Sequence, residues 1–322
     1  MEPHPQAKEI SDKLAKEGIH YLYHFTDVEN LAKIAQLGGL RCKSVLRREG
    51  HWEGVKPGGN ELSHALNGKR GNLEYVHLNF TPYTPMAYNL KPESHLCFFC
   101  VSPSIASWQG IQFTDCNATD SDHTKGEGMV GLELVDFEEV RAVIRPWDRA
   151  WITGVQAEVL VPQTVPLSEI DHVSFVSPAS LAYGERLWGH ASHPPFAVDQ
   201  SCFDNSPGHE TPLVSFPFVD RVVLTPDVVT KETYTSKRKH QTVFERDVHE
   251  WVTAIATGPS AAGLAGAMRW TPLGKDTQFK FQRPSNYTWW DQVKVADLRN
   301  GVNTVELTLN GICWSKVDFT VK

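Results

Sequence analysis

The alternation of apolar and polar positions predicts a helix, a strand and a second helix at the start of the chain. Ile10 and Leu14 are four residues apart, the spacing of one helix face, and the residues that follow are rich in β-branched and aromatic side chains. Asp27 is a suitable N-cap for the next apolar stripe at helical spacing. The expected order is a helix over 5–17, a strand over 19–25 and a helix that begins after Asp27 and ends at Gly38-Gly39.

Short apolar segments bounded by turn residues predict further strands before residue 195. These are 74–80, 95–101, 129–134, 156–161 and 171–176. The proline-containing segment 81–88 is expected to open a short helix. Residues 41–72 follow no steady period, which is typical of a long loop with a functional or mobile role.

The composition and the hydrophobic pattern of the sequence change after about residue 194. Residues 196–208 are rich in Pro, Ser, Asp and Asn and are expected to form a linker. Short alternating segments follow at 213–224, 278–281, 293–298 and 304–312, and 243–255 is the one stretch with a helical pattern. The expected domains are 1–195, a linker over 196–210 and a β-rich domain over 211–322, to which the sequence assigns no activity.

Composition narrows the class of protein. Apolar residues make up 41% of the 322 positions and charged residues 21%, which is typical of a globular protein and excludes a disordered or collagen-like chain. No stretch approaches the roughly 18 consecutive apolar residues of a membrane helix, and the first sixteen residues have no apolar signal-peptide core. Six scattered cysteines do not form a disulfide framework, so we expect a cytoplasmic protein without a membrane partner.

The charge is divided unevenly along the chain. Residues 201–322 hold 14 Lys and Arg against 13 Asp and Glu, a net charge of +1. Because the whole chain has a net charge of −7, residues 1–200 carry about −8. An acidic N-terminal half does not coat nucleic acid by bulk electrostatics. If the protein acts on a polynucleotide, its basic surface must therefore be local.

Two short strand motifs carry candidate chemistry. His24 and Thr26 project to the same face of a strand, and so do Gln156 and Glu158, because the side-chain period of a strand is two. Glu158 is surrounded by apolar neighbours, and a bare buried carboxylate is costly. It must therefore open onto a cleft or have a dedicated partner, such as a core arginine.

Three motifs in order resemble those of one family. These are Tyr23-His24-Phe25-Thr26 followed by Asn30-Leu31, Asn79-Phe80-Thr81-Pro82 leading to Pro85-Met86-Ala87-Tyr88, and Gln156-Ala157-Glu158-Val159-Leu160-Val161. Together they resemble the DarT-type DNA ADP-ribosyltransferases over roughly residues 19–190. The His-x-Thr element alone is shared with poly(ADP-ribose) polymerases and tRNA 2′-phosphotransferases, so the ordered set carries the resemblance.

The resemblance implies an α+β fold, in which a split, curved β-sheet with flanking helices holds NAD as co-substrate in a cleft, with the β-rich region added C-terminally. The implied reaction breaks the nicotinamide–ribose bond and attaches ADP-ribose to a nucleobase, without a metal. A carboxylate beside the ribose stabilises the positive charge of the oxocarbenium-like transition state. The implied catalytic residues are Glu158 and His24, and the implied NAD-binding residues are His24, Thr26, Asn30, Phe80, Met86 and Tyr88.

The resemblance also implies an arginine from the loop before the second motif and a turn before Glu158 that recognises the acceptor. Arg70 is the first choice for the catalytic cation, because an arginine fork can clamp a diphosphate, with Lys69 and Arg48 behind it. In the acceptor turn, the implied nucleic-acid contacts are Arg145, Arg149 and Trp151, whose alternation suits stacking on a single strand.

Structural interpretations stand beside these functional ones. His24 alone is also compatible with a satisfied structural histidine, Arg70 with a solvated loop residue, and Trp147 and Trp151 with a helical core contact. Several further features are expected to be structural: Cys97 and Cys100 as parts of a buried strand rather than zinc ligands, Lys237 to His240 as a solvated turn, and Trp289-Trp290 as core.

The leading hypothesis is a DarT-like toxin or phage-defence effector that modifies DNA. Such activity damages the host, so the resemblance implies a neutralising antitoxin, such as a macrodomain protein that removes ADP-ribose. The same chemistry on RNA is the main alternative. Transfer to a protein side chain and a non-catalytic nucleotide-binding module are the others, and the retained Glu158 argues against the module.

Overall fold

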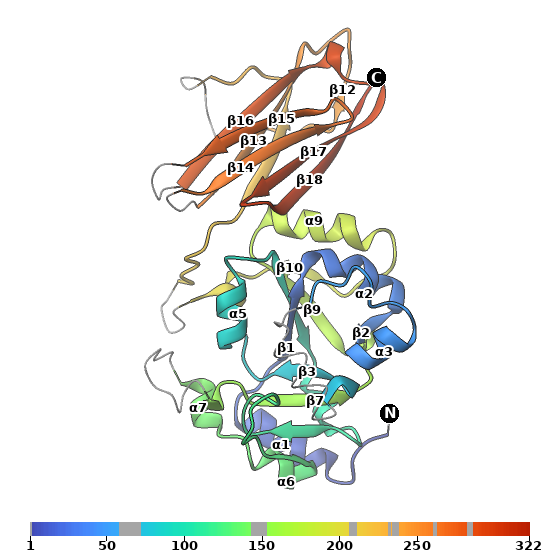
Figure 1. Cartoon of the computed structure of the whole chain (residues 1–322), viewed down its shortest axis with the longest axis vertical. Helices are drawn as coiled ribbons and strands as arrows, with labels where there is room; N and C mark the ends of the chain where they lie inside the picture. Colours follow the sequence, from blue (N-terminus) through green and yellow to red (C-terminus); the bar gives the residue numbers. More distant parts are fainter. Residues whose placement is uncertain are drawn as a thin grey trace. The chain divides into compact units, whose positions relative to one another are not determined.

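The computed structural model describes residues 2–57, 72–142, 153–205, 211–230, 233, 238–259, 263–281 and 286–322. The chain divides into two compact units. The first comprises Met1–Phe175 and Leu187–Val214, and the second comprises Val176–Arg186 and Ser215–Lys322. Figure 1 labels many of the helices and strands of both units.

The first unit combines short helices with one large sheet. Its α-helices are α1 (Ala7–Lys16), α2 (Leu31–Leu37), α3 (Lys43–Arg48), α5 (Pro85–Leu90), α6 (Gly128–Leu132) and α7 (Phe137–Arg141). Its 3-10 helices are η1 (Val28–Asn30), η2 (Asn72–Glu74), η3 (Pro103–Ser107), η4 (Leu167–Glu169) and η5 (Gln200–Phe203). Most of α9 (Pro178–Trp188) belongs to the second unit.

Within the described residues the main sheet has eight strands in the order β10-β9-β4-β1-β3-β7-β5-β6. Their bounds are β10 (Phe196–Val198), β9 (Ile170–Phe175), β4 (Leu96–Val101), β1 (Leu22–Asp27), β3 (Tyr75–Asn79), β7 (Glu158–Pro162), β5 (Gln112–Thr114) and β6 (Lys125–Glu127). A separate antiparallel pair is formed by β2 (Gly39–Arg41) and β8 (Thr164–Pro166).

The main sheet is split between β1 and β3. These two strands meet over a single pair, Tyr23 and Asn79, whereas β1 pairs along its whole length with β4, and β3 along its whole length with β7. Backbone groups on the facing edges of β1 and β3 therefore need partners other than each other. This is the split sheet that the resemblance to the DarT-type family implies, and Figure 1 shows β1 and β3 at the middle of the first unit.

The core of the first unit is centred on β4. All six of its residues are buried, because antiparallel neighbours β1 and β9 pair with both of its edges and apolar side chains cover both faces. Cys97 and Cys100 belong to this buried strand, as expected. Among the described residues, no group of three His, Cys, Asp or Glu could hold a metal ion, and no helix is long and apolar enough to cross a membrane.

Local capping follows the sequence closely in the first 90 residues. The Asp27 side chain accepts a hydrogen bond from the Glu29 N–H at 2.9 Å and so caps η1, as the predicted N-cap does. Thr84 caps α5 in the same way, with Pro85 at its first position, which is the short helix expected after the proline-containing turn. Gly38 ends α2 in the left-handed conformation.

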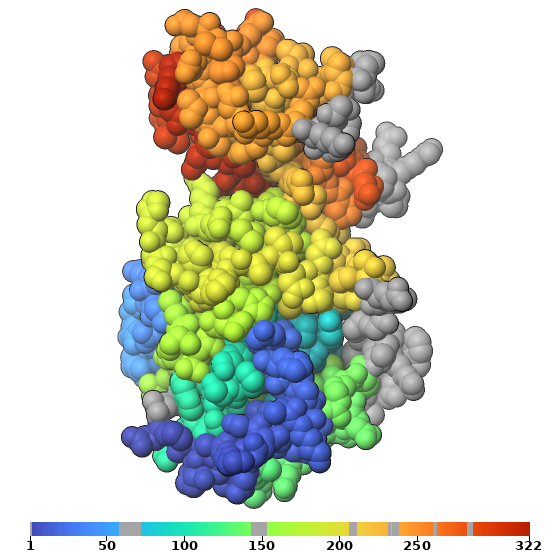
Figure 2. Space-filling view, turned by 180° about the vertical axis from the view of Figure 1, so that it is seen from behind, coloured from blue at the N-terminus to red at the C-terminus, as the bar shows by residue number. Residues whose placement is uncertain are grey.

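The N-terminal segment is tied to α6 and η3. Gln6 Oε1 accepts from the Met129 N–H at 3.1 Å, and the His4 N–H donates to the Ser107 carbonyl at 2.8 Å. The buried Ile10 and Leu14 give α1 its packed face. Figure 2 shows the N-terminal residues in blue beside the green segment that contains α6 and α7.

The described part of the second unit contains a three-stranded and a five-stranded sheet. The first is β11 (Arg221–Thr225), β13 (Trp251–Pro259) and β16 (Asn286–Lys294); the second is β12 (Val243–Phe244), β18 (Ile312–Val321), β17 (Gly301–Leu309), β14 (Ala265–Thr271) and β15 (Lys275–Lys280), with η6 (Val295–Asp297) after β16. Trp270 Nε1 of β14 donates to Asp291 Oδ2 of β16 at 2.7 Å, and the Phe279 and Trp289 rings stack at 3.8 Å. These contacts join the two sheets around one core. Trp289 packs at its edge and is half-buried, and so is Trp290, so the two tryptophans expected as core are not fully buried.

Four sequence expectations are corrected by the structure. The expected loop over 41–72 contains the helix α3 among its described residues. Residues 129–134, expected as a strand, contain α6, and the expected helix over 243–255 is divided between β12 and β13. The first is a short apolar run, for which periodicity does not separate strand from helix. The second has apolar residues at helical spacing, but the pairing of β13 with β11 and β16 overrides this local pattern. In the expected linker, β10 pairs with β9 and η5 buries Cys202 and Phe203, so these residues belong to the first unit. The predicted boundaries at 195 and 211 stay a prediction about independently folding domains.

The close approach of β2 to β8 yields a stability prediction. A Cβ at Gly39 would lie 2.4 Å from the Val165 carbonyl oxygen, whereas nothing lies within 4 Å of one at the exposed Gly38. Gly39→Ala should therefore destabilise the first unit by about 1–3 kcal/mol, because backbone must move. Calorimetric unfolding measures this, with Gly38→Asn, which tolerates the left-handed conformation, as the control. Equal transition temperatures for the two variants would contradict the assignment.

Candidate active site

A cleft of about 220 Å³ opens in the first unit where the main sheet splits. It is lined by residues of β1, β2, β3 and α2, by the segment 52–57, and by Asn117, Thr119, Gln156 and Glu158. His24 and Thr26 of β1 and Glu158 of β7 thus face one cavity although 132 positions separate them along the chain, from residue 26 to residue 158. The structure therefore brings together the two strand motifs that the sequence singles out.

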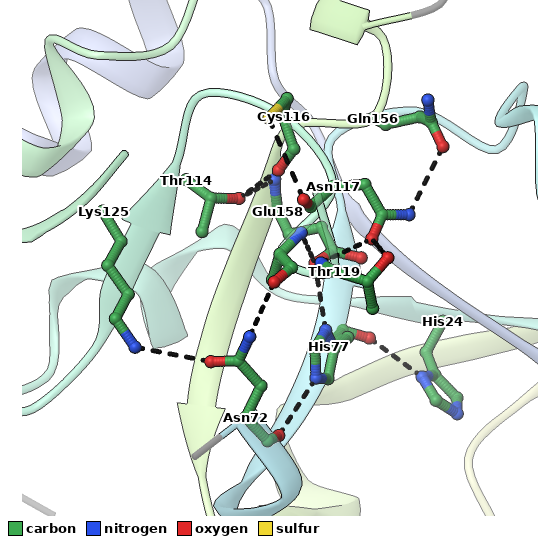
Figure 3. A network of polar contacts seen from close by, with 11 residues as sticks. His24, Asn72, His77, Thr114, Cys116, Asn117, Thr119, Lys125, Gln156 and Glu158 are labelled. Carbon is green, nitrogen blue, oxygen red and sulfur yellow. Dashed lines mark hydrogen bonds and ion pairs between the residues drawn. The ribbon is translucent and has the colours of Figure 1, made fainter. Parts of the chain in front are cut away.

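Glu158 is the first residue of β7 and is only 7% exposed. Its Oε2 accepts from the Ala118 N–H at 3.1 Å and from His77 Nδ1 at 3.0 Å, and its own N–H donates to Thr114 Oγ1 at 3.0 Å (Figure 3). Because its backbone and one carboxylate oxygen are held in this way, the side chain has a fixed position. The dedicated partner of this carboxylate is a histidine and not a core arginine.

His77 lies on β3, beside Glu158, with both ring nitrogens engaged. Nδ1 faces Glu158 Oε2, and Nε2 lies 3.2 Å from the Asn72 carbonyl oxygen (Figure 3). Burial by itself lowers the pKa of His77, but the negative charge and the hydrogen bond of Glu158 outweigh it and raise the pKa above the ordinary value.

His24 is oriented by the backbone of β3. Its Nδ1 lies 3.0 Å from the His77 carbonyl oxygen, and because a carbonyl only accepts, Nδ1 carries the proton. Burial lowers the pKa of His24, so the ring is neutral near pH 7 and keeps Nε2 as an acceptor. The split between β1 and β3 leaves this carbonyl available to a side chain.

Thr26 and Asn30 join β1 to the wall of the cleft. Asn30 Nδ2 donates to Thr26 Oγ1 at 2.9 Å and to the Lys56 carbonyl at 2.8 Å, while Asn30 Oδ1 accepts from the Lys56 N–H at 2.9 Å. Asn30, itself 7% exposed, thereby fixes the segment 52–57 against β1.

Four cations and several apolar side chains line the remaining walls. The cations are Lys33, Arg41, Lys43 and Lys56, and the apolar side chains include Ile34, Leu37, Leu46, Trp52 and Val55. Arg41 and Lys56 form ion pairs with Glu49 at 3.8 Å and Glu29 at 2.7 Å, which neutralise part of this charge. Burial lowers the pKa of Lys43, while the charge of Glu158 acts in the opposite direction. The cleft therefore combines a positively charged wall, an apolar wall and one buried carboxylate.

The three predicted apolar contacts of NAD lie in different places. Met86 lines the cleft. Phe80 is 4% exposed and packs edge-on against Phe137, outside the set of lining residues, and Tyr88 is 50% exposed and also outside it. Their predicted contacts with the cofactor stay predictions, and the packing of Phe80 gives it a structural role.

The predicted loop cations and acceptor turn fall mostly outside the described residues. This holds for Lys69, Arg70, Arg145, Trp147, Arg149 and Trp151. Arg48 is described; it ends α3, is exposed and does not line the cleft. The roles proposed for these side chains remain predictions from the sequence.

His77, Asn72 and Asn117 were missed by the sequence analysis. The Asn72 carbonyl oxygen faces His77 Nε2 (Figure 3). Asn117 Nδ2 donates to Oε1 of Gln156, two residues before β7, at 3.3 Å. A signal was present for His77 alone, since Tyr75, His77 and Asn79 place polar groups on one face of an otherwise apolar strand.

A split sheet that presents a buried carboxylate and an oriented histidine to one cleft defines the ADP-ribosyltransferase class. The family model of DarT, described as an ssDNA thymidine ADP-ribosyltransferase, matches residues 23–203, which include every lining residue of the cleft. The chain belongs to this family, and it is therefore an NAD-dependent ADP-ribosyltransferase. The family's acceptor agrees with the DNA hypothesis and gives no support to the RNA alternative.

Solved DarT structures are similar to this chain at low identity. Thermus sp. 2.9 DarT in complex with ADP-ribosylated ssDNA has 17% identity and a TM-score of 0.48, over 57% of this chain and 96% of its own. Its complex with NAD+ has 17% identity and a TM-score of 0.46, over 57% and 97%. Thermosipho africanus DarTG in complex with ADP-ribose has 22% identity and a TM-score of 0.46, over 57% and 51%. No curated protein sequence matches the chain.

The contacts of Asn30 predict a binding defect separable from the chemistry. Asn30→Ala removes two hydrogen bonds to the backbone of Lys56 and one to Thr26, so KM for NAD should rise about tenfold, the equivalent of one or two net hydrogen bonds, while kcat changes less. Steady-state kinetics measure both constants. Gln36→Ala, an exposed amide of α2, is the matched control, and an unchanged KM in Asn30→Ala would contradict this role.

Proposed function

We propose that this chain transfers ADP-ribose from NAD to the thymine base of single-stranded DNA, with Glu158 as the catalytic carboxylate. The observation that carries the proposal is that Glu158, 7% exposed, faces the same cleft as the neutral, oriented His24. The family to which the chain belongs supplies the acceptor, thymidine in ssDNA. The geometry of the cleft supports the assignment of residues to steps.

The walls of the cleft suit a dinucleotide. Lys33 and Lys43 supply positive charge for a diphosphate, in a chain that is acidic overall. Arg41 and Lys56 line the same cleft but are paired with Glu49 and Glu29. The apolar wall around Trp52 suits an adenine ring, which stacks on aromatic side chains. His24 Nε2, as an acceptor, and Thr26 Oγ1 suit hydrogen bonds to the hydroxyls or the amide of the nicotinamide riboside.

The reaction is a substitution at the anomeric carbon of the ribose next to nicotinamide. The C–N bond breaks, its electron pair leaves with neutral nicotinamide, and the sugar passes through an oxocarbenium-like state that the Glu158 carboxylate stabilises. In thymidine, N3 is the only ring nitrogen that carries a proton. N3 attacks the anomeric carbon, and Glu158 accepts the N3 proton as general base, a role typically worth about 10²–10⁴-fold.

The same activity implies partners of two kinds. One is single-stranded DNA, for which the predicted contacts Arg145, Arg149 and Trp151 lie outside the described residues. The other is a neutralising antitoxin, because ADP-ribosylation of the producer's own DNA is toxic. A macrodomain that removes ADP-ribose has the chemistry to reverse the reaction. Co-expression with such a protein tests this part of the proposal through growth and through the ADP-ribose content of genomic DNA.

Replacement of the carboxylate gives the decisive measurement. Glu158→Gln keeps the size of the side chain but removes its charge. The rate of ADP-ribose transfer should therefore fall by about 10²–10⁴-fold, while NAD still binds. Labelled NAD and a thymidine-containing single strand measure transfer, and nicotinamide release is measured in parallel.

The controls are a strand without thymidine, a matched RNA, and Glu133→Gln, which removes an exposed carboxylate outside the cleft. Label on the DNA is expected for the wild type and for Glu133→Gln only. Wild-type turnover by Glu158→Gln would remove Glu158 from the reaction. Label on RNA or protein in place of DNA would contradict the acceptor.

A further inference from the structure

His77 sits between two hydrogen-bond acceptors at the base of the cleft. On one side is the Glu158 carboxylate, 3.0 Å from Nδ1, and on the other is the Asn72 carbonyl oxygen, 3.2 Å from Nε2. A neutral imidazole has one N–H and can donate to only one of them. The imidazolium has two and satisfies both. The geometry on its own therefore favours a doubly protonated ring.

We propose that His77 is a positioning residue, held as an imidazolium, that fixes one oxygen of Glu158 and leaves the other for the sugar and the base. The proposal rests on the proposed function of Glu158 and adds a residue to it. His77 does not touch the substrate in this scheme; it acts through the carboxylate.

The hydrogen bonds of Glu158 divide its two oxygens unequally. Among the described residues, the carboxylate accepts from the Ala118 N–H and from His77 Nδ1, and both donors reach Oε2. Oε1 is thereby the oxygen left for the ribose hydroxyl and for the N3 proton of thymine. A carboxylate held by one oxygen presents the other at a fixed angle, which general-base catalysis requires.

The charged surroundings of His77 agree with an imidazolium. Glu158 of β7 is the nearest opposite charge, at 3.0 Å, whereas Lys43 of α3 opposes a further positive charge. His24 on β1, whose pKa is lowered by burial, is neutral and adds no positive charge. Tyr75 is the other titratable group on this face of β3. The influence of Glu158 outweighs burial, and the pKa of His77 lies above its ordinary value.

This arrangement has a consequence for pH. Below the raised pKa, His77 is charged and donates to both acceptors; above it, the ring has one N–H and must give up either Glu158 or Asn72. The positioning effect is therefore present at low pH and is lost as pH rises through that pKa. The wild-type kcat should fall on the alkaline side for this reason.

The kinetic test uses His77→Gln, which retains one donor but not the charge. We expect kcat to fall about 10- to 100-fold, the equivalent of one charge-assisted hydrogen bond, with KM for NAD within twofold and without the alkaline decline. His77→Ala with added imidazole should regain part of kcat and the decline together. His20→Gln, an exposed histidine, is the control. A wild-type alkaline decline that persists in His77→Gln would overturn the proposal.

A second measurement does not depend on activity or on the folding of a His77 variant. In ¹⁵N NMR of the wild type, His77 should titrate above 6.5, and in Glu158→Gln its midpoint should move down, because the negative partner is gone. Equal midpoints in the two proteins would overturn the proposal. If Glu158→Gln turns over normally, the proposed function fails as well; if only the His77 results fail, the function of Glu158 stands.

Discussion

The first unit depends on an interruption of its own sheet. Where β1 and β3 separate, backbone groups that a continuous sheet would pair can form hydrogen bonds with side chains. His24 Nδ1 donates to the carbonyl oxygen of His77 in this way. This interruption opens the cleft and orients one histidine, while the pairing of β3 with β7 places the other beside Glu158. The stability of this arrangement comes from the fully buried β4, which joins β1 to β9 on the side away from the split.

Electrostatics inside the cleft are local and differ from the charge of the whole chain. The chain carries −7 overall, yet four cations line the cleft, and its buried carboxylate has a histidine partner. A carboxylate that is 7% exposed can stay ionised only where donors and a positive charge compensate the loss of water. The acidic exterior therefore does not oppose a bound dinucleotide, because short-range contacts dominate over the screened field of the surface.

The sequence predicts this site where the information is local. His24 and Glu158 stand out through strand periodicity, and Asp27 and Thr84 cap the elements that the sequence indicates. The role of His77 depends on the pairing of β3 with β7, 81 positions apart, which no single window of sequence contains. The prediction for 129–134 was wrong because a short apolar run fits strand and helix equally. The prediction for 243–255 was wrong because strand pairing with distant segments overrides a local helical pattern.

The two hydrogen bonds between the Asn30 side chain and the backbone of Lys56 have a consequence for ligand recognition. Both polar backbone groups of that residue are engaged before any ligand arrives, so one wall of the cleft is preorganised. Association against this wall loses little conformational entropy, in contrast to a surface that must fold around its ligand. Differences in affinity among related nucleotides should then arise mainly in how fast they leave, and less in how fast they arrive.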